Sequence, residues 1–406
     1  MADERRNDLA LRDLASGRCW TFAQLFATGE AQQAEAGEII CPQGHSPEFF
    51  FSLLSAWRTG KVACPLDSGQ IAPDFAPPPR DCVHLKLTSA TSGPAHLIAF
   101  TAEQLAADAA QIVSAMDLRP DRPNLGVISL AHSYGFSNLV LPLLLHGIPL
   151  ILAPSPLPEI VRNAAANEPA VSLPAVPALW RAWHEAGGVP AQVGLAISAG
   201  APLPLNLEEA VFETKGIKIH NFYGASECGG IAYDASAEPR TDAALAGTPL
   251  PGVSVSLNAE GCLMVRGLAV GLTYWPEESN ALGDRTFQTS DLAELKNGSV
   301  FLRGRLSDLI NVAGRKVSPE TIERALLAHP RVRECLVFGA QSQDEQRMDV
   351  IIAVVAASAG ENELKQFLLE SLPSWQLPRR WQFVESLSAG SRGKISRAEW
   401  RRLFAG

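Results

Sequence analysis

Short apolar runs alternate with longer amphipathic stretches through the middle of the chain. The apolar runs are HLKLTSA, NLGVISL, IPLILA, AVSLPA, GLAISAG and IKIHNFYG, all between residues 84 and 224. The stretch 102–116 repeats its apolar positions with helical spacing and predicts a helix between the first two runs. Strands separated by helices in this rhythm are typical of an α/β core with a largely parallel sheet.

The pattern changes after Pro249, where short runs alternate apolar and polar positions. These runs are VSVSL, GCLMVRG and AELKNGSVFLRGR. Asn297 and Gly298 separate two of them, and this dipeptide is a strong signal of a β-hairpin. We therefore expect a β-rich subdomain over about 249–306.

A further unit is expected over 307–406. The stretch SPETIERALLAHP predicts a helix that Ser318 caps and that Pro319 begins. Two apolar runs follow, ECLVFGA and DVIIAVVAA, and then a helix over 361–372. This pattern predicts a compact α+β domain.

The chain has 406 residues, more than the roughly 150 residues of an ordinary domain. Hydrophobic residues make up 47% of it, which is enough to bury sizeable cores. Together with the patterns above, this predicts an α/β protein. A large N-terminal domain of α/β layers over 1–306 would contain the β-rich subdomain, and a small α+β domain would follow over 307–406.

The charge and the apolar stretches narrow the choice of partner. The formal net charge is -9 and the chain has no long basic run, so neither nucleic acid nor an anionic membrane is expected as the main partner. The most apolar stretch, 138–154, is broken by Pro142, Gly147 and Pro149 and is too short to span a bilayer. We therefore expect a small-molecule ligand and no integral membrane segment.

The cysteines and the N-terminus indicate a cytoplasmic protein. The seven cysteines stand singly, without a CxxC pair, so neither a zinc site nor a disulfide framework is expected. A reducing cytoplasm suits such a chain. The first residues alternate in charge and lack the apolar region of a signal peptide.

Two polar motifs after apolar runs could bind parts of a nucleotide. In LTSATSGPAHLIAFT, over 87–101, hydroxyl and backbone N–H groups could converge on phosphate, although a plain polar turn explains the motif more simply. In HNFYGASECGG, over 220–230, an aromatic ring could stack on a base. Ser226 could reach a phosphate, and Glu227 could hold Mg²⁺. The alternative for this motif is a strand that ends in a turn with a solvated carboxylate.

Two further motifs lie nearer the C-terminus. Asp291 is expected at the end of a strand, where its two oxygens could accept both hydroxyls of a ribose, and Arg305 is a candidate second donor. The loop GSRGKISR presents Lys394, a cation that a distant domain could deliver to a reaction centre. Taken singly, a surface hairpin and a solvated tail are the simpler explanations of these residues.

Taken together in this order, the four motifs resemble those of the acyl-adenylate-forming (AMP-binding) superfamily, nearest its acyl- and aryl-CoA synthetases. The first is similar to the family's phosphate loop T-S-G-T-T-G-x-P-K, and YGASE to its aromatic-Gly-x-Thr/Ser-Glu motif. The stretch GRLSDLINVAGRKVSPETIE resembles G-R-x-x-D…G-x-x-V-x-P-x-E-I-E, and GKISR resembles G-K-I-x-R. The likeness covers nearly the whole chain. It implies ATP-dependent activation of a carboxylic acid to an acyl-adenylate, transfer of the acyl group to a thiol, and a mobile C-terminal lid.

The resemblance also implies a role for each matching residue. The residues implied to hold the ATP phosphates are Thr88, Ser89, Thr91, Ser92 and Gly93. The rest of the nucleotide would be bound by Tyr223 and Gly224 at the adenine, Ser226 at the α-phosphate, and Asp291 and Arg305 at the ribose. The catalytic set is Lys394, Glu227 as the Mg²⁺ ligand, and His132 beside the acyl pocket. The walls of that pocket would be Tyr134, Gly135, Ala199, Gly200 and Ala201, and Asp308 would be the hinge.

The acceptor and the acid remain open at this stage. Coenzyme A is expected as the co-substrate, because the sequence contains no carrier domain. The alternatives are a free acyl carrier protein, cyclisation of a 3-hydroxy acid through its adenylate, and a non-catalytic nucleotide-binding homologue. The small and aromatic residues of SYGFSN and GASECGGIAYD suit either an aryl acid or a medium-chain acid.

The sequence departs from the family pattern in three places. His96 stands where the phosphate loop has lysine, and Ala90 and Ser290 replace glycines. A histidine side chain is mostly neutral near pH 7, so we expect weaker ATP binding than a lysine-bearing loop would give. The N-terminal portion is also short, and a homodimer or a partner protein would cover an edge exposed in this way.

Overall fold

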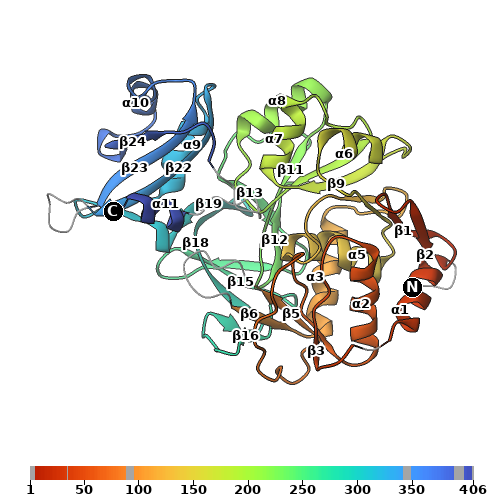
Figure 1. Cartoon of the computed structure of the whole chain (residues 1–406). Helices are drawn as coiled ribbons and strands as arrows, with labels where there is room; N and C mark the ends of the chain where they lie inside the picture. Colours follow the sequence, from red (N-terminus) through yellow and green to blue (C-terminus); the bar gives the residue numbers. More distant parts are fainter. Residues whose placement is uncertain (1–4, 34, 88–95, 342–348, 388–396, 405–406) are drawn as a thin grey trace.

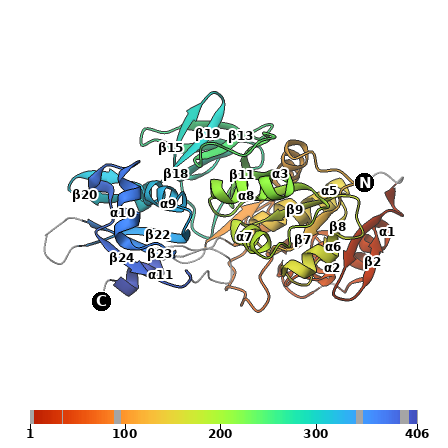
Figure 2. The same cartoon turned by 90° about the horizontal axis from the view of Figure 1, so that it is seen from above.

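The computed structural model describes residues 5–33, 35–87, 96–341, 349–387 and 397–404. In Figures 1 and 2 the C-terminal elements and the first strands lie at opposite ends of the molecule, with the mixed sheets between them. Within these residues, no helix combines the length and the apolar character that crossing a bilayer requires.

A layer of parallel strands forms the centre of the large domain. In spatial order its strands are β11 (Ile219–Ala225), β10 (Val193–Ser198), β9 (Val171–Ala175), β7 (Asn124–Gly126), β8 (Leu150–Leu152) and β1 (Leu9–Asp13), and β2 (Arg18–Thr21) adds an antiparallel edge. Helices cover both faces, which is why the strand sequences are almost continuously apolar. The predicted α/β class and its parallel layer are confirmed.

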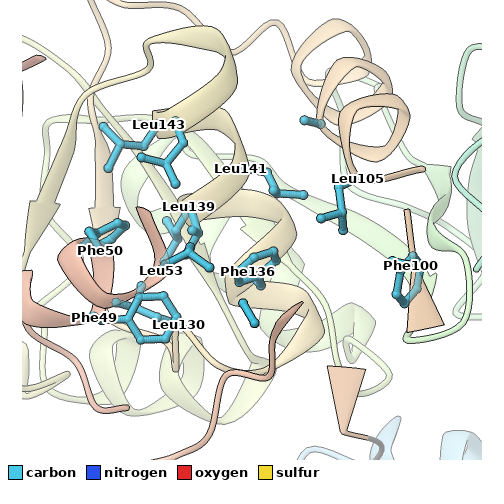
Figure 3. Packing of buried hydrophobic residues seen from close by; sticks show 14 of the residues in the cluster. Phe49, Phe50, Leu53, Phe100, Leu105, Leu130, Phe136, Leu139, Leu141 and Leu143 are labelled. Atoms are coloured by element: carbon cyan, nitrogen blue, oxygen red, sulfur yellow. The ribbon is translucent and has the colours of Figure 1, made fainter. Parts of the chain in front are cut away.

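Successive residues of β8 show the two covered faces. Leu150 and Leu152 belong to one buried cluster and Ile151 to another, because side chains alternate across a strand. The Ile151 cluster contains residues of α6 (Pro158–Ala165), α7 (Pro177–Glu185) and α8 (Leu205–Lys215). The opposite cluster contains residues of α2 (Pro47–Arg58), α3 (Ala102–Ala115) and α5 (Leu141–His146), whose packing Figure 3 shows.

The sheet continues beyond β11 as antiparallel strands. In spatial order these are β12 (Gly229–Tyr233), β13 (Leu245–Pro249), β19 (Ser299–Arg305), β18 (Thr286–Lys296), β15 (Cys262–Arg266) and β14 (Ser254–Leu257), with β17 (Leu282–Gly283) beside β18. Asn297 and Gly298 connect β18 to β19 with φ of 51° and 76°. These left-handed conformations are the ones that a tight hairpin requires, so the predicted hairpin is confirmed.

A second, mixed sheet contains β5 (His84–Leu87), the first of the apolar runs. Its order is β16 (Thr273–Trp275), β6 (Leu97–Phe100), β5, β4 (Val62–Ala63) and β3 (Ile39–Ile40). The run HLKLTSA was therefore wrongly predicted to lie in the parallel layer. β5 pairs antiparallel with β6, the next strand along the chain, because a short connection between two strands permits only this direction.

Capping boxes show where two helices of the large domain begin more clearly than the apolar pattern does. Thr21 and Gln24 form a capping box at the start of α1 (Phe22–Ala31), and Thr101 and Gln104 form another at α3. In each box the threonine side chain accepts from a backbone N–H, and the glutamine side chain accepts from the threonine N–H. The sequence CWTFAQL therefore held a helix signal that the apolar pattern alone did not show.

The elements after β19 form a unit that contains buried clusters of its own. They are η3 (Leu306–Asp308), β20 (Ile310–Val312), β21 (Arg315–Val317), α9 (Pro319–Leu327), β22 (Val332–Gln341), β23 (Asp349–Ala357), α10 (Glu361–Leu369), η4 (Ser374–Gln376), β24 (Arg380–Phe383) and α11 (Arg397–Phe404). Ser318 precedes α9 as predicted, but its side chain makes no cap. The Ser318 hydroxyl instead donates to Glu320 Oε2 at 2.6 Å. The domain boundary at residues 306 and 307 stays a prediction.

Candidate functional site

Tyr223, Asp291 and Arg305 come together although they lie far apart in the sequence. Asp291 lies in the middle of β18 and not at a strand end as predicted, because β18 continues to Lys296 in the hairpin with β19. It pairs with Arg305 of β19, whose Nε donates to Asp291 Oδ1 at 2.9 Å. The hydroxyl of Tyr223, near the end of β11, donates to Asp291 Oδ2 at 2.5 Å. Burial and the neighbouring Asp291 carboxylate raise the pKa of Tyr223 well above its ordinary value, so the phenol stays a donor. The carboxylate is thereby oriented at both oxygens.

Glu227 lies in the tight turn that joins β11 to β12. Gly224, in β11 just before this turn, has no room for a side chain, because a Cβ there would lie 2.6 Å from the carbonyl oxygen of Gly229. Tyr274 of β16 donates its hydroxyl to Glu227 Oε1 at 2.9 Å. The ring of His96 packs edge-on against Tyr274, with 6.0 Å between the ring centroids. Ser226 lies in the same turn and is partly buried.

Glu227 presents one carboxylate that could take part in holding a magnesium ion. Among the described residues there is no group of three or more His, Cys, Asp or Glu side chains that could hold a metal. Mg²⁺ usually binds through one or two carboxylates together with water and the phosphates of the substrate. The single Glu227 carboxylate suits an ion of this kind.

A buried lysine that the sequence reasoning missed lies close to this turn. Lys86 of β5 places its Nζ 3.7 Å from Asp108 Oδ2, 3.5 Å from Ser133 Oγ and 4.5 Å from the centroid of the Phe100 ring. Burial lowers the pKa of Lys86, against the fields of Asp108 and Glu227. The charged residue within the apolar run HLKL was the signal that could have identified it.

Asp108 contacts both Lys86 and β12, the strand that follows the turn. Its Oδ2 accepts from the Ser137 hydroxyl at 2.5 Å and its Oδ1 from the backbone N–H of Gly230 at 3.1 Å. A cation, a hydroxyl and an amide therefore share one buried carboxylate. The arrangement fixes the start of β12 against α3.

His132 contacts a carboxylate and, through it, a hydroxyl, and neither partner was predicted. It stands at the N-cap position of α4 (Ser133–Gly135), but its side chain makes no cap. Nε2 of His132 lies 2.8 Å from Asp67 Oδ2. Asp67 Oδ1 accepts from the Ser129 hydroxyl at 2.6 Å. Asp67 follows β4, a distant part of the chain, so only the fold brings it to His132.

The residues predicted to line the acyl pocket lie at the carboxyl ends of parallel strands. The hydroxyl of Tyr134 is 3.4 Å from the carbonyl oxygens of Ala175 and Ile197, at the ends of β9 and β10. Ala199 and Gly200 directly follow β10, and Gly200 has φ of +85°. Ligands of open α/β sheets bind at this edge. Ala201 comes next and is partly exposed.

Gly135 is held close to the preceding loop. A Cβ at this position would lie 2.0 Å from the carbonyl oxygen of Ser129, so no other residue fits without a backbone shift. The loop carrying Ser129 and His132 therefore packs directly on the first turn of α4.

Asp308, the predicted hinge residue, is bound by Arg397 at the start of α11. Nη1 of Arg397 lies 2.8 Å from Asp308 Oδ2 and 2.8 Å from Glu320 Oε1, and its Nη2 lies 2.7 Å from Glu323 Oε2. Burial acts to lower the pKa of Arg397, but the field of these carboxylates is stronger and raises it. The beginning of α11 is thus fastened to the segment that follows β19.

Six of the predicted site residues lie outside the described residues. These are Thr88, Ser89, Thr91, Ser92, Gly93 and Lys394. Their predicted roles at the ATP phosphates and in catalysis therefore rest only on the sequence resemblance to the family.

Comparison with protein families gives two matches along the chain. The family model described as "AMP-binding enzyme" matches residues 67–275, and the model described as "AMP-binding enzyme C-terminal domain" matches residues 321–394. Together they include the Tyr223–Glu227 turn, His132 and the region that follows the predicted hinge.

Curated relatives with similar sequences include several coenzyme A ligases. The chain is 30% identical to the mitochondrial malonate–CoA ligase ACSF3 of Mus musculus over 51% of this chain and 42% of the relative. It is 27% identical to the 2-succinylbenzoate–CoA ligase of Bacillus cytotoxicus over 71% and 63%, and 29% identical to the anthranilate–CoA ligase of Pseudomonas aeruginosa over 61% and 52%. The chain thus spans about half the length of the curated relatives it matches.

Solved structures share the fold of this chain. ATP-bound MatB from Rhodopseudomonas palustris matches with a TM-score of 0.87 at 20% identity, covering 100% of this chain and 97% of MatB. The o-succinylbenzoate CoA synthetase MenE of Bacillus subtilis, in complex with its acyl-adenylate, matches with a TM-score of 0.83 at 21% identity, covering 98% and 96%. At these identities the likeness shows the architecture alone.

Proposed function

The chain belongs to the AMP-binding enzyme family, and from that premise we propose that it activates a carboxylic acid with ATP and transfers the acyl group to coenzyme A. In the first half-reaction an acid oxygen attacks the α-phosphorus of ATP, which gives an acyl-adenylate and pyrophosphate. In the second, a thiol attacks the acyl carbon and AMP leaves. Both halves depend on positioning and on neutralising charge.

The observation that carries this proposal is the set Tyr223, Asp291 and Arg305. The two Asp291 oxygens are already aligned by a phenol and a guanidinium, and a carboxylate with two oriented oxygens can accept the two hydroxyls of a ribose. Glu227 stands in the turn that directly follows the strand of Tyr223. A nucleotide with its sugar at Asp291 would therefore have its phosphates near Glu227.

Each remaining site residue has a proposed part in the two steps. Glu227, oriented by Tyr274, would hold Mg²⁺. The ion supplies positive charge to the phosphates when bound. Lys394 would sit between the acid oxygen and the α-phosphate while these anions approach. Movement about Asp308 would then withdraw Lys394 and admit the thiol.

An acyl carrier protein is the second candidate acceptor. The chain is 32% identical over 233 residues to a fatty acid–acyl-carrier-protein ligase, ScoC of Streptomyces coeruleorubidus. The relatives differ in their acids as well, which are malonate, 2-succinylbenzoate and anthranilate by name. Either acceptor presents a pantetheine thiol, so the residues above would serve both.

The cysteines support a reducing location. All seven carry free thiols, which suits the cytoplasm better than an oxidising compartment. A homodimer that covers the short N-terminal region stays a prediction.

The experiment offers the protein Mg-ATP, coenzyme A and a panel of acids that includes malonate, 2-succinylbenzoate, anthranilate and medium-chain fatty acids. AMP release and the mass of the acyl thioester are measured. We expect AMP and thioester in equal amounts with at least one acid. Asp291→Ala should lose most of this activity through a raised KM for ATP, whereas Asp121→Asn at the exposed surface should behave as the wild type. The absence of AMP with every acid would refute the proposal.

A further inference from the structure

Cys41 and Cys64 lie directly opposite each other at the ends of two neighbouring parallel strands. β3 and β4 are paired residue by residue up to Ile40 and Ala63, and an isolated bridge two residues beyond each cysteine keeps the same register. The backbone N–H of Cys64 donates to the carbonyl oxygen of Ile40 at 2.7 Å. The strand pairing therefore continues through the two cysteines without a slip.

Both thiols lie on the same face of this sheet. Cys64 belongs to a buried cluster against which Cys41 packs. Ile40 and Ala63, one residue earlier on each strand, belong to the core cluster on the opposite face, as the alternation of side chains requires. Neighbouring strands lie about 4.8 Å apart, and the Cα atoms of a disulfide lie about 4.4–6.8 Å apart. The two positions therefore permit a bridge.

Cys82 is a neighbour of Cys64 in the same cluster but does not stand opposite it. The pairing of β4 with β5 places Leu85 opposite Cys64. The Cys82 thiol donates to the carbonyl oxygen of His84 at 3.4 Å. The register therefore selects Cys41 as the partner of Cys64.

Cys41 is the thiol of this pair that can react first. β3 is the edge strand of its sheet and Cys41 is partly exposed, whereas Cys64 is fully buried. A hydrogen bond from the Cys64 thiol lowers the pKa of Cys41, against burial and the field of Glu35. The same hydrogen bond, together with burial, raises the pKa of Cys64. Because the thiolate is the nucleophile, thiol exchange starts at Cys41.

The strand end that carries Cys64 leads within three residues to the candidate site. Asp67 Oδ2 lies 2.8 Å from Nε2 of His132, and Asp67 Oδ1 accepts from the Ser129 hydroxyl at 2.6 Å. A backbone shift at Cys64 would therefore reach the loop of Ser129 and His132 through contacts that follow one another directly.

We propose that Cys41 and Cys64 are a dithiol site that a small-molecule disulfide oxidises reversibly, and that the resulting bridge weakens the contacts of Asp67 with the loop of His132. The Cys41 thiolate attacks one sulfur of the small disulfide, which forms a mixed disulfide and releases one thiolate. The Cys64 thiolate then attacks the Cys41 sulfur and releases the second. The two protein protons pass to the released thiolates, and the two electrons that the cysteines lose reduce the small disulfide.

The spacing of the strands explains both the shift and its reversal. The Cα atoms of a disulfide most often lie about 5.5–6 Å apart, which is wider than the spacing of neighbouring strands. A bridge at Cys41 and Cys64 would therefore push the ends of β3 and β4 apart. A bridge strained in this way is readily reduced, which suits a reducing compartment.

The first test identifies the bridge in the full-length protein. The reduced wild type is incubated with oxidised glutathione, free thiols are blocked, and peptides are identified by mass. We expect a peptide pair joined through Cys41 and Cys64 that dithiothreitol separates. Cys64→Ala should retain glutathione on Cys41, and Cys41→Ala should leave Cys64 a free thiol. Cys19, which is exposed on β2 opposite Arg12, is the internal control and should carry glutathione alone.

Hydrogen exchange tests whether the bridge reaches the site. In the oxidised wild type the backbone amides of 64–68 and 129–133 should exchange about fivefold faster than in the reduced protein, the ratio that one lost hydrogen bond gives. Cys41→Ala treated with the same oxidant should show no change, because it cannot form the bridge. Neither this measurement nor the peptide mapping uses a substrate.

A third measurement relates the bridge to activity and rests on the proposed function. Hydroxylamine traps the acyl-adenylate as a hydroxamate and, unlike coenzyme A, brings no thiol that would reduce the bridge. With the acid that gives most AMP in the panel above, oxidation should slow hydroxamate formation about tenfold in the wild type, because small displacements at a site are costly. Dithiothreitol should restore the rate, and Cys41→Ala should not respond to the oxidant.

The outcomes separate this inference from the proposed function. If no peptide joins Cys41 to Cys64, or if Cys64 joins Cys82 in its place, the inference is wrong. A bridge that leaves the exchange of 129–133 unchanged would overturn its link to the site. A wild type that forms no hydroxamate with any acid would refute the proposed function alone, since mapping and exchange decide the inference without an acid.

Discussion

The hydroxyl of Tyr274 lies 2.9 Å from Glu227 Oε1 and connects two sheets of the large domain at the candidate metal carboxylate. Tyr274 comes from β16 of the mixed sheet, and Glu227 follows β11 of the parallel layer. The same tyrosine ring packs against His96. The Tyr274 side chain therefore contacts both Glu227 and His96, and His96 stands where the family's phosphate loop has lysine.

Removing the Tyr274 hydroxyl should weaken the use of magnesium. In Tyr274→Phe the ring still packs on His96, but Glu227 loses a donor worth about 1 kcal/mol. We expect the Mg²⁺ concentration at half-maximal adenylation to rise about fivefold, which is that energy expressed as a ratio. A titration of hydroxamate formation with Mg²⁺ measures it. An unchanged midpoint would show that Tyr274 does not orient the metal carboxylate.

A lysine in place of His96 should improve ATP binding. Histidine is mostly neutral near pH 7, whereas lysine keeps its charge. We expect His96→Lys to lower the apparent KM for ATP in the adenylation assay, and His96→Gln to leave it near the wild-type value. If His96→Lys has no effect on KM, the side chain points away from the phosphates.

Removing the charge of Lys86 alone should destabilise the fold, because Asp108 would stay charged and buried without its cation. Lys86→Met leaves Asp108 as a buried anion whose donors, within the part of the chain that the structure describes, are the Ser137 hydroxyl and the Gly230 amide. We expect the free energy of unfolding to fall by about 3–5 kcal/mol. Lys86→Met combined with Asp108→Leu should recover part of this loss, because no charge is then buried. Urea unfolding measures both, and a loss below about 1 kcal/mol would contradict the interpretation.

Asp234, which accepts hydrogen bonds from Lys218 and Ser236, should make the fold less stable in acid. Burial acts to raise the pKa of Asp234, but hydrogen bonds from Lys218 and Ser236 outweigh it, and the pKa falls below its ordinary 3.8. The unfolded chain therefore binds a proton more readily than the folded protein. The stability from this group is complete above about pH 4 and is lost as the pH falls through the lower, folded value.

Asp234→Asn provides the matched comparison for this acid effect. Its free energy of unfolding should be lower than that of the wild type at pH 6, and the difference should shrink from pH 4 to pH 2. A difference that stays constant over this range would show that Asp234 stabilises the fold without its charge.

Local signals predicted much of the fold, because they depend on neighbours in the sequence. The hairpin at Asn297 and Gly298 and the strands of the parallel layer are of this kind. The run containing His84 was assigned to the wrong sheet, since pairing partners depend on the connection and not on apolar content. Ser318 took the predicted position, but its hydroxyl found a competing acceptor in Glu320.

The candidate site was only partly predictable, because a sequence pattern identifies single residues but not the distant residues that they contact. Residues within recognisable motifs, such as Asp291 and Glu227, were singled out with a chemical role. Asp67 and Ser129 were given no chemical role, and Tyr274 was not associated with Glu227, because these contacts join strands and loops from distant parts of the chain. Such partners are visible only once the chain has folded.

The most direct measurement of the central claim is the exchange of labelled pyrophosphate into ATP without coenzyme A. This exchange requires the reversible formation of an acyl-adenylate and depends on no acceptor. The wild type should exchange label only when a suitable acid is present, and Lys394→Ala, with an unchanged folded spectrum, should lose the exchange. No exchange by the wild type with any acid, or equal exchange by Lys394→Ala, would contradict the account.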